Sequence, residues 1–372
     1  MKRREFISQG ASAAGLTFVG CGLGGLAACA ESTHAGERRE VVVNGKRAMT
    51  VDIHAHSYVH DVYPLIEGRH ELDYLQSVLQ NEILLGKIDI DSVDFRLQQM
   101  DAQGIDMQAV SLHVGQYHHW AEHDLAKEIV NVQNTRIAEL CAAHPDRFVG
   151  IGAVAMQHPE LAVQQMKYAI RELDMRGFMI TGSVEGEELS SPRFHPFWAA
   201  AEELGTVIFI HPRYFPDAKN RLQGNGGLPN VIGNPLETTV ALSHLIFEGT
   251  LDRYPGVKIC AAHGGGYLAS YIGRSDHCVE NHPGFCTAVD KLPSEYLKRL
   301  YFDSLIYTSE NLRHLIATVG ADRIVLGTDF PFRMGNRESV DHILSVPDLS
   351  ADEQRAMLGG TLAGLLQIDD KA

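Results

Sequence analysis

The sequence predicts a (β/α)8 barrel, the fold in which eight parallel strands alternate with helices. Eight short apolar segments alternate with segments of helical periodicity, and four of the short segments end in an ionisable side chain. The expected strands are residues 49–55, 107–114, 148–155, 177–182, 206–212, 258–263, 301–307 and 323–329. Such alternation favours a parallel sheet. No Gly-x-Gly-x-x-Gly motif follows an early strand, which counts against a doubly wound, dinucleotide-binding sheet.

Between the expected strands, apolar residues recur every three or four positions, as in an amphipathic helix. One such stripe comprises Ala162, Met166, Ala169, Ile170 and Leu173. Asn234-Pro235-Leu236-Glu237 predicts a capped helix start, with the helix running to about Gly249. Long segments at 57–92 and 213–233 follow the first and fifth strands. Loops in these positions build the active site of a barrel.

The N-terminus differs from the rest of the chain. The pair Arg3-Arg4 precedes an apolar, Gly/Ala-rich stretch from about Ala11 to Ala28, which is too short and too Gly-rich to span a membrane. Residues 1–30 are therefore predicted to be a twin-arginine export signal, and residues 40–372 a single catalytic domain. The alternative is a cytoplasmic protein in which the arginine pair is accidental.

Two endings of this signal fit the sequence. Leu26-Ala27-Ala28-Cys29 resembles a lipobox, which would place a lipid anchor on Cys29, whereas Ala28-Cys29-Ala30 fits an ordinary cleavage site. Either ending predicts a periplasmic protein, and the first a membrane-anchored lipoprotein. Among the later cysteines, Cys278 and Cys286 could pair in an oxidising compartment, although two free thiols fit equally well.

Charge and cysteine spacing exclude two kinds of site. The formal net charge is −15, and no basic stripe with interleaved aromatic residues occurs, so nucleic acid is not an expected partner. The sequence contains no Cys-x-x-Cys pair, so a zinc site built on thiolates is not indicated.

Ionisable side chains close four of the expected strands. His54 and His56 end the first strand and point to the same side, about 7 Å apart. His211 ends the fifth strand, His263 the sixth and Asp329 the eighth. In a barrel the carboxyl ends of the strands converge around the axis, where catalytic residues lie.

Three imidazoles and a carboxylate suit zinc, and also iron, cobalt or manganese. We expect His54, His56, His211 and Asp329 to bind one divalent metal, with zinc preferred. A metal-bound water would then ionise near pH 7, and His263 would act on it as a general base from outside the ligand set. Asp329 is thus expected to serve both as a ligand and in catalysis.

Other residues are candidates for substrate contact. Arg213 could bind a carboxylate bidentately or pair with a loop acid, and His113 could line the pocket from the second strand. We place the remaining candidates of that region on a loop or helix start: His118, His119, Trp120 and His123. Asp303 could hydrogen-bond a ligand histidine and fix its tautomer, or cap a helix.

The strand-end motifs resemble those of the amidohydrolase-related family, and within it the aminocarboxymuconate semialdehyde decarboxylases. They are Val51-Asp52-Ile53-His54-Ala55-His56, Ala262-His263-Gly264-Gly265-Gly266 and Leu326-Gly327-Thr328-Asp329-Phe330-Pro331. The similarity runs from about residue 49 to 366. It implies the ligands and base named above. It also implies a homodimer in which Arg274 reaches a substrate carboxylate across the interface. Residues 177–182 lack the lysine that bridges two metals in amidohydrolases, so one metal is expected.

The resemblance implies a metal-dependent, non-oxidative decarboxylase acting on an unsaturated or aromatic carboxylic acid. Two positions depart from the decarboxylase pattern: residues 80–87 lack its substrate-binding arginine and offer only Lys87, and Arg213 replaces a tryptophan. The export signal is a third departure. The alternatives are a hydrolase of a C–C, ester, lactone or amide bond at the same metal, and a periplasmic binding lipoprotein without catalysis.

Overall fold

A computed structural model describes residues 38–68 and 85–368 of the chain. Contacts between residues divide the chain into two units, and the described residues all belong to the second, Gly36–Ala372. The predicted export signal and Cys29 lie outside the described residues. Within the described part, no helix is long and apolar enough to cross a membrane.

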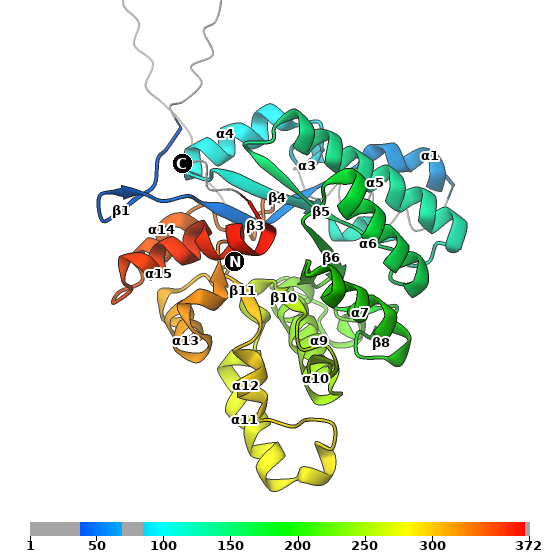
Figure 1. The fold of residues 1–372 in the computed structure, drawn as a ribbon, viewed down its shortest axis with the longest axis vertical. Helices are drawn as coiled ribbons and strands as arrows, with labels where there is room; N and C mark the ends of the chain where they lie inside the picture. The colour runs from blue at the N-terminus through cyan, green and yellow to red at the C-terminus, as the bar shows by residue number, and fades with distance from the viewer. Residues whose placement is uncertain (1–37, 69–84, 369–372) are drawn as a thin grey trace, which may run out of the picture. The chain divides into compact units, whose positions relative to one another are not determined.

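Eight parallel strands surround the core of the second unit (Figure 1). They are β3 (Val51–Ser57), β4 (Met107–Leu112), β5 (Phe148–Gly152), β6 (Gly177–Thr181), β9 (Val207–His211), β10 (Lys258–Ala261), β11 (Tyr301–Asp303) and β12 (Ile324–Val325). Their order is β12-β11-β10-β9-β6-β5-β4-β3. Each of the eight expected strands is present, mostly with an earlier end than predicted. The barrel prediction is therefore confirmed.

Backbone hydrogen bonds join the first and last strands of this order. The Ile53 amide donates to the Leu326 carbonyl at 3.0 Å, and the His56 amide donates to the Phe330 carbonyl at 2.8 Å. The Phe330 amide donates back to the His54 carbonyl at 3.2 Å. The segment after β12 thus lies beside the end of β3. This contact brings Asp329 next to the two histidines of β3.

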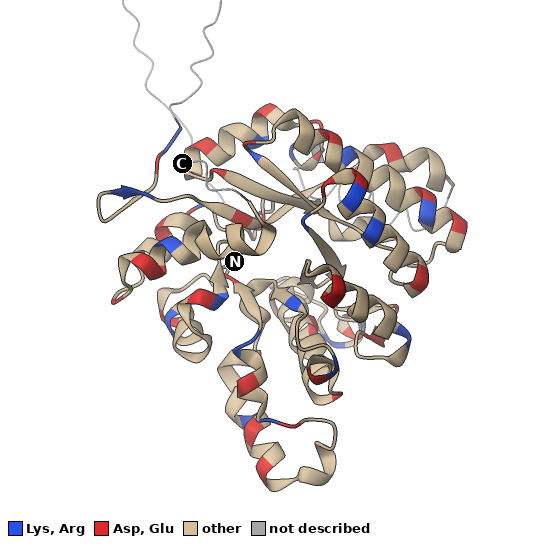
Figure 2. Ribbon diagram, viewed as in Figure 1, with Lys and Arg blue, Asp and Glu red and all other residues tan. Residues whose placement is uncertain are grey.

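Helices and short hairpins connect the strands. The helices are α1 (Tyr63–Ile66), α3 (Leu85–Ile88), α4 (Val93–Gln103), α5 (His123–Ala143), α6 (Pro159–Leu173), α7 (His195–Leu204), α8 (Ala218–Arg221), α9 (Asn234–Phe247), α10 (Thr250–Arg253), α11 (Leu268–Asn281), α12 (Pro293–Leu297), α13 (Ser309–Val319), α14 (Ser339–Ser345), α15 (Ala351–Arg355) and α16 (Thr361–Leu366). The hairpins are β1 (Val42–Val43) with β2 (Lys46–Arg47), and β7 (Ser183–Val184) with β8 (Glu187–Glu188). Acidic and basic residues are interspersed on the outer helices (Figure 2).

The apolar pattern of the sequence explains which helix faces are buried. On α6, Ala162, Met166 and Ala169 are buried, while Ile170 and Leu173 are partly buried at the edge of the same stripe. The strands are buried on both faces, as expected where helices cover a parallel sheet.

The predicted cap of α9 is wrong. A π-helical turn over Pro229–Gly233 runs directly into α9, so the chain is already helical where Asn234 begins the helix. Gly233 has helical backbone angles, and no side chain caps the helix. The carboxylate of Glu237 instead accepts a hydrogen bond from the Ser183 hydroxyl at 2.6 Å. The helix ends at Phe247, just before Gly249 in the left-handed conformation.

Candidate metal centre

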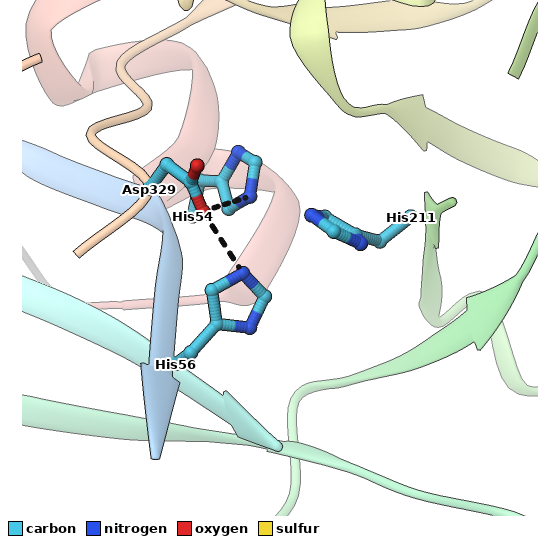
Figure 3. A group of neighbouring side chains, drawn as sticks. All are labelled: His54, His56, His211 and Asp329. Carbon is cyan, nitrogen blue, oxygen red and sulfur yellow. Dashed lines mark ion pairs between the residues drawn. The ribbon is translucent and has the colours of Figure 1, made fainter. Parts of the chain in front are cut away.

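Four buried side chains meet at the carboxyl ends of β3, β9 and β12. His54, His56, His211 and Asp329 each offer one ligand atom, and these atoms all lie within 4.8 Å of one another (Figure 3). Because side chains alternate along a strand, His54 and His56 emerge from the same face of β3, and their ring centroids are 5.1 Å apart. The structure therefore brings together the four residues predicted as ligands.

Hydrogen bonds leave one nitrogen of each β3 histidine facing the cluster. His54 Nδ1 bonds the carboxylate of Asp303 at 2.6 Å, and His56 Nδ1 bonds the Leu112 carbonyl at 2.9 Å. Both Nε2 atoms lie 3.2 Å from one oxygen of Asp329, without a hydrogen-bond partner of suitable geometry. Both ring nitrogens of His211 are likewise buried and unbonded.

Buried polar atoms without partners are rare in folded proteins, and they need a reason. Three imidazole nitrogens and one carboxylate oxygen converging on a point form a donor set that suits a divalent metal ion. Among the described residues, this is the only cluster of three or more such side chains within bonding reach of one ion. The residues present therefore fit one divalent metal.

The electrostatics of the cluster agree with this assignment. Burial disfavours the charged form of His54, but the charge of Asp329 and the hydrogen bond of Asp303 outweigh it and raise the pKa to about 10. Burial lowers the pKa of His56, and burial together with His54 holds the pKa of His211 well below its usual range. In spite of burial, the neighbouring His54 keeps the pKa of Asp329 well below its usual range. A divalent cation would replace the proton that His54 otherwise shares with the acid.

A second buried carboxylate fixes β3 relative to the segment that carries Asp329. Asp52 accepts hydrogen bonds from the His54 amide at 2.9 Å and from the Thr328 amide at 3.1 Å. It also accepts from the Thr328 hydroxyl at 2.6 Å and from Gln108 Nε2 at 3.1 Å. Burial raises the pKa of Asp52 to about 6, which leaves it charged at neutral pH. Asp52 thus connects the backbone of His54 with Thr328, the residue before Asp329.

His263 lies beside the cluster, at the end of β10. Its ring centroid is 5.1 Å from the rings of both His54 and His211, and its Nδ1 has no hydrogen-bond partner. Burial and the charge of His54 lower the pKa of His263 to about 4, so its ring is neutral at pH 7 and can accept a proton. His263 and Asp329 have φ of 54° and 58°, in a region that non-glycine residues seldom adopt. Such backbone strain often accompanies functional sites.

The cluster opens into a cavity of about 810 Å³, within the range of small-molecule sites. Asp329 is the only carboxylate among its described lining residues, whereas Arg213 and Arg333 both contribute to its wall. Burial and the charge of Arg213 lower the pKa of His118, another wall residue, to about 4. Among its described lining residues, the cavity thus holds two guanidinium groups and one carboxylate, although the net charge of the chain is −15. It is therefore suited to an anionic ligand.

The candidate substrate residues have different outcomes. Arg213 and His113 line the cavity, as do two of the residues that we placed on a loop or helix start, His118 and Trp120. His119 and His123 are not among its described lining residues. Burial and the nearby His56 lower the pKa of His113 to about 3, so the ring is neutral. Arg213 and His113 thus line the same cavity as His211 and Asp329 of the cluster.

Two other candidates lie away from this wall. Arg274 is exposed on α11 and is not among the described lining residues of its own chain. Lys87, the possible substitute for a missing arginine, lies 4.9 Å from the centre of the Phe95 ring and is also absent from that lining.

The sequence analysis missed Arg333 and Tyr307, which line the cavity beyond β12 and β11. Their positions shortly after the ends of two strands were a usable signal, because the loops there face the barrel mouth. The tyrosine hydroxyl donates to the Met334 carbonyl at 2.6 Å and so joins the two loops.

Two known proteins illustrate the sequence similarity. The chain is 31% identical over 336 residues to 2-amino-3-carboxymuconate-6-semialdehyde decarboxylase of Dictyostelium discoideum, covering 87% of this chain and 93% of that protein. It is 32% identical over 274 residues to gamma-resorcylate decarboxylase of Rhizobium radiobacter, covering 68% and 79%.

Solved structures share the fold. The 5-carboxyvanillate decarboxylase of Sphingomonas paucimobilis superimposes with a TM-score of 0.78 at 24% identity, covering 87% of this chain and all of that one. A dihydroxybenzoic acid decarboxylase of Polaromonas sp. JS666, solved with bound manganese, gives 0.72 at 24% identity over 86% and 97%. A family model described as Amidohydrolase matches residues 51–366. Because this match spans most of the barrel and of the chain, the protein belongs to the amidohydrolase family.

Proposed function

We propose that this protein is a metal-dependent, non-oxidative decarboxylase of an unsaturated or aromatic carboxylic acid. The observation that carries the proposal is that His211 and Asp329 of the four-residue metal cluster line one cavity together with the neutral His263 and Arg213. Its relatives in sequence include decarboxylases of a carboxymuconate semialdehyde and of gamma-resorcylate, both of which are carboxylic acids.

The reaction replaces a carboxylate by a proton and releases carbon dioxide. When bound at the four ligands, a divalent ion supplies a Lewis acid that polarises an oxygen of the substrate. Arg213 holds a substrate carboxylate through paired N–H donors, which also fixes the plane of that group. His263 takes up a proton from solvent at its neutral ring and delivers it to the substrate carbon that loses the carboxylate. Asp329 remains ionised beside the reacting group and offsets positive charge there.

We further propose zinc as the native ion, because a set of three histidines and one aspartate is typical of zinc. Manganese is the alternative, since it is bound in the related Polaromonas structure. Metal analysis of protein purified without added metal distinguishes them. A stoichiometric zinc content supports the proposal, whereas manganese as the retained and activating ion contradicts it.

Arg274 is proposed to act in a homodimer. Its exposure on α11, away from the cavity of its own chain, is compatible with contact to a second copy. Activity should then fall when the protein is diluted below its dimer dissociation constant. An Arg274→Ala variant that still forms dimers should show a raised KM. Full activity as a monomer would contradict this role.

The sequence-based localisation also stands as a proposal: twin-arginine export to the periplasm, followed either by lipidation of Cys29 or by cleavage without an anchor. Fusion of residues 1–40 to a reporter protein tests it directly. Replacing Arg3 and Arg4 by lysines should retain the reporter in the cytoplasm. Replacing Cys29 by serine should abolish labelling by a fatty acid if the lipid anchor exists.

The decisive experiment for the reaction is product analysis with a panel of hydroxybenzoic and muconate-type acids. Release of carbon dioxide together with the decarboxylated product supports the proposal, provided that a chelator abolishes the release. A parallel panel of esters, lactones and amides tests the hydrolytic alternative. Metal-dependent hydrolysis with no carbon dioxide from any acid would overturn the assignment.

A further inference from the structure

The far end of α11 and the turn that follows it contain little buried structure. In Figure 1 this part lies at the outer edge of the barrel, away from the strands. From residue 270 to residue 292 the only buried residue is Cys286. A segment with so few buried contacts opens locally at low free-energy cost. A covalent link within such a segment would limit this local opening.

Backbone hydrogen bonds define the turn after α11. The His282 amide donates to the Cys278 carbonyl at 2.8 Å, and the Phe285 amide to the His282 carbonyl at 2.9 Å. The Cys286 amide donates to the Pro283 carbonyl at 3.1 Å. The rings of His282 and Phe285 stack with centroids 5.7 Å apart. Together these contacts reverse the chain within one short segment.

The reversal places two thiols in contact. The Cys286 thiol donates to the sulfur of Cys278, and the two Sγ atoms are 3.6 Å apart. Both cysteines are free in this structure. A disulfide requires the sulfur atoms to approach to about 2.0 Å. Formation of the bond therefore requires the two side chains to rotate toward each other.

We propose that Cys278 and Cys286 form a reversible disulfide that closes the loop of residues 278–286. The co-reactant is a small-molecule disulfide such as oxidised glutathione. The Cys278 thiol, which is partly exposed, loses its proton and attacks one sulfur of the oxidant, releasing one reduced thiol. The Cys286 sulfur then loses its proton and attacks Cys278 Sγ, releasing the second thiol. Two cysteine thiols are oxidised and one oxidant disulfide is reduced.

The order of attack follows from the environments of the two sulfurs. Burial and the contact with Cys278 raise the pKa of the Cys286 thiol, which makes it the weaker attacker of an oxidant in solution. Once Cys278 carries the mixed disulfide, however, Cys286 already lies beside the sulfur that it must attack. Proximity then favours ring closure over the loss of the oxidant.

The link acts on a helix that begins at the cavity. Tyr267 and the first residues of α11, including Ala269 and Ser270, line the cavity wall. The helix is interrupted at Tyr271, where φ is −131°, and the thiols lie beyond this break. A disulfide at the last turn therefore restrains the outer part of α11, which also carries Arg274. This inference does not depend on the proposed decarboxylation.

The sequence supplies a direct assay. Trypsin cleaves after Arg274 and Lys291, so residues 275–291 form one peptide that contains both cysteines and no internal site. The full chain is equilibrated with oxidised glutathione, alkylated under denaturing conditions and digested with trypsin. The mass of the peptide is then measured by mass spectrometry. We expect this peptide to be unalkylated and lighter by two hydrogens than its reduced form. Alkylation of both cysteines, or retention of glutathione on either, would overturn the proposal.

Matched variants report on the consequence for α11. Hydrogen exchange of residues 275–291 should be slower in the oxidised wild type than in the reduced protein. The oxidant should slow this exchange in Cys141→Ser, which leaves the pair intact. It should not change the exchange in Cys278→Ser or Cys286→Ser. Equal exchange of the oxidised and reduced wild type, with the disulfide present by mass, would contradict the restraint on the helix.

Discussion

Asp303 holds His54 through a hydrogen bond of 2.6 Å between its carboxylate and His54 Nδ1, and both side chains are fully buried. The other oxygen of Asp303 accepts from the amides of Gly264 at 2.8 Å and Leu305 at 3.2 Å. One carboxylate thus joins β11 to the ligand histidine of β3 and to the turn that follows His263. It fixes the His54 ring so that Nε2 faces the cluster.

Asp303→Asn should weaken metal binding by about 10- to 100-fold, because outer partners of ligand histidines contribute this much to affinity. The asparagine side chain carries no negative charge. It has only one oxygen to accept from the three donors that Asp303 binds, His54 Nδ1 and the amides of Gly264 and Leu305. Chelator competition measures the dissociation constant. The control is Asp322→Asn, which alters a carboxylate whose side chain is mostly exposed and paired with Arg323. Equal metal affinity in the wild type and Asp303→Asn would contradict the role.

His211→Ala and His263→Ala should separate metal binding from chemistry. His211 is one of the four converging residues, so its removal should abolish both the bound metal and the activity. His263 lies outside that set, so its removal should leave the metal in place and lower kcat by about 100- to 10,000-fold. Metal content by elemental analysis and kcat by product formation are measured on the same samples. Retention of full activity in both variants would contradict both assignments.

Much of this centre could be predicted because it depends on local rules. Alternation along a strand places His54 and His56 on one face, and convergence of strand ends in a barrel adds His211, His263 and Asp329. For Asp303, the sequence left two roles open, a hydrogen bond to a ligand histidine or a helix cap. The structure shows the hydrogen bond to His54. The hydrogen bonds of Asp52 to Thr328 join residues far apart in sequence and depend on barrel closure, which no local pattern encodes.

The fold shows the same division. The eight strands followed from apolar runs, whereas the start of α9 did not follow from its cap signal. Asn234 and Pro235 fit a helix start locally, but the preceding π-helical turn had no distinct sequence signature and already supplied the helical backbone. Glu237 lies in the first turn of α9, but its carboxylate bonds the Ser183 hydroxyl of β7 and does not cap the helix. Tertiary contacts therefore outweighed a local preference.

Arg213→Lys should raise KM for the acid by about 10- to 100-fold, because an ammonium cannot make the paired, planar contact of a guanidinium. The change keeps the positive charge of the cavity wall, so any loss is attributable to geometry. Arg221→Ala, an exposed residue at the end of α8, is the control and should leave KM unchanged. Steady-state kinetics on the substrate found in the acid panel provides the measurement. An unchanged KM in Arg213→Lys would exclude bidentate binding.

Glu237 should make the protein less stable as the pH rises from about 4.5 to 7. Burial raises the pKa of this carboxyl to about 7 in the folded chain from a usual value of 4.5. Over that window the folded state keeps a proton that the unfolded state has lost, so the free energy of unfolding decreases with pH. The limiting effect is about 3 kcal/mol. Denaturant unfolding of the wild type and Glu237→Gln at several pH values measures it, and parallel pH profiles of the two proteins would rule it out.

Thr328→Val and Thr328→Ser test whether the Asp52 contacts position the metal ligands. The Thr328 hydroxyl donates to Asp52 at 2.6 Å and accepts from the Phe330 amide at 3.2 Å. Thr328 and Phe330 are the two residues that flank Asp329 in the sequence. Valine has the same shape but removes both hydrogen bonds of the hydroxyl, one of them to the charged carboxylate of Asp52, so unfolding should require about 1–3 kcal/mol less free energy. Serine keeps the hydroxyl and should remain close to the wild type.

The same pair should separate positioning from stability. If Thr328 orients Asp329, Thr328→Val should bind metal more weakly than Thr328→Ser even at a temperature where both are fully folded. The visible spectrum of the cobalt-substituted protein should also change in the valine variant, because that spectrum depends on coordination geometry. A valine variant that is less stable but has unchanged metal affinity and an unchanged cobalt spectrum would reduce Thr328 to a structural role. The ligand geometry would then be set by β3 and Asp303 alone.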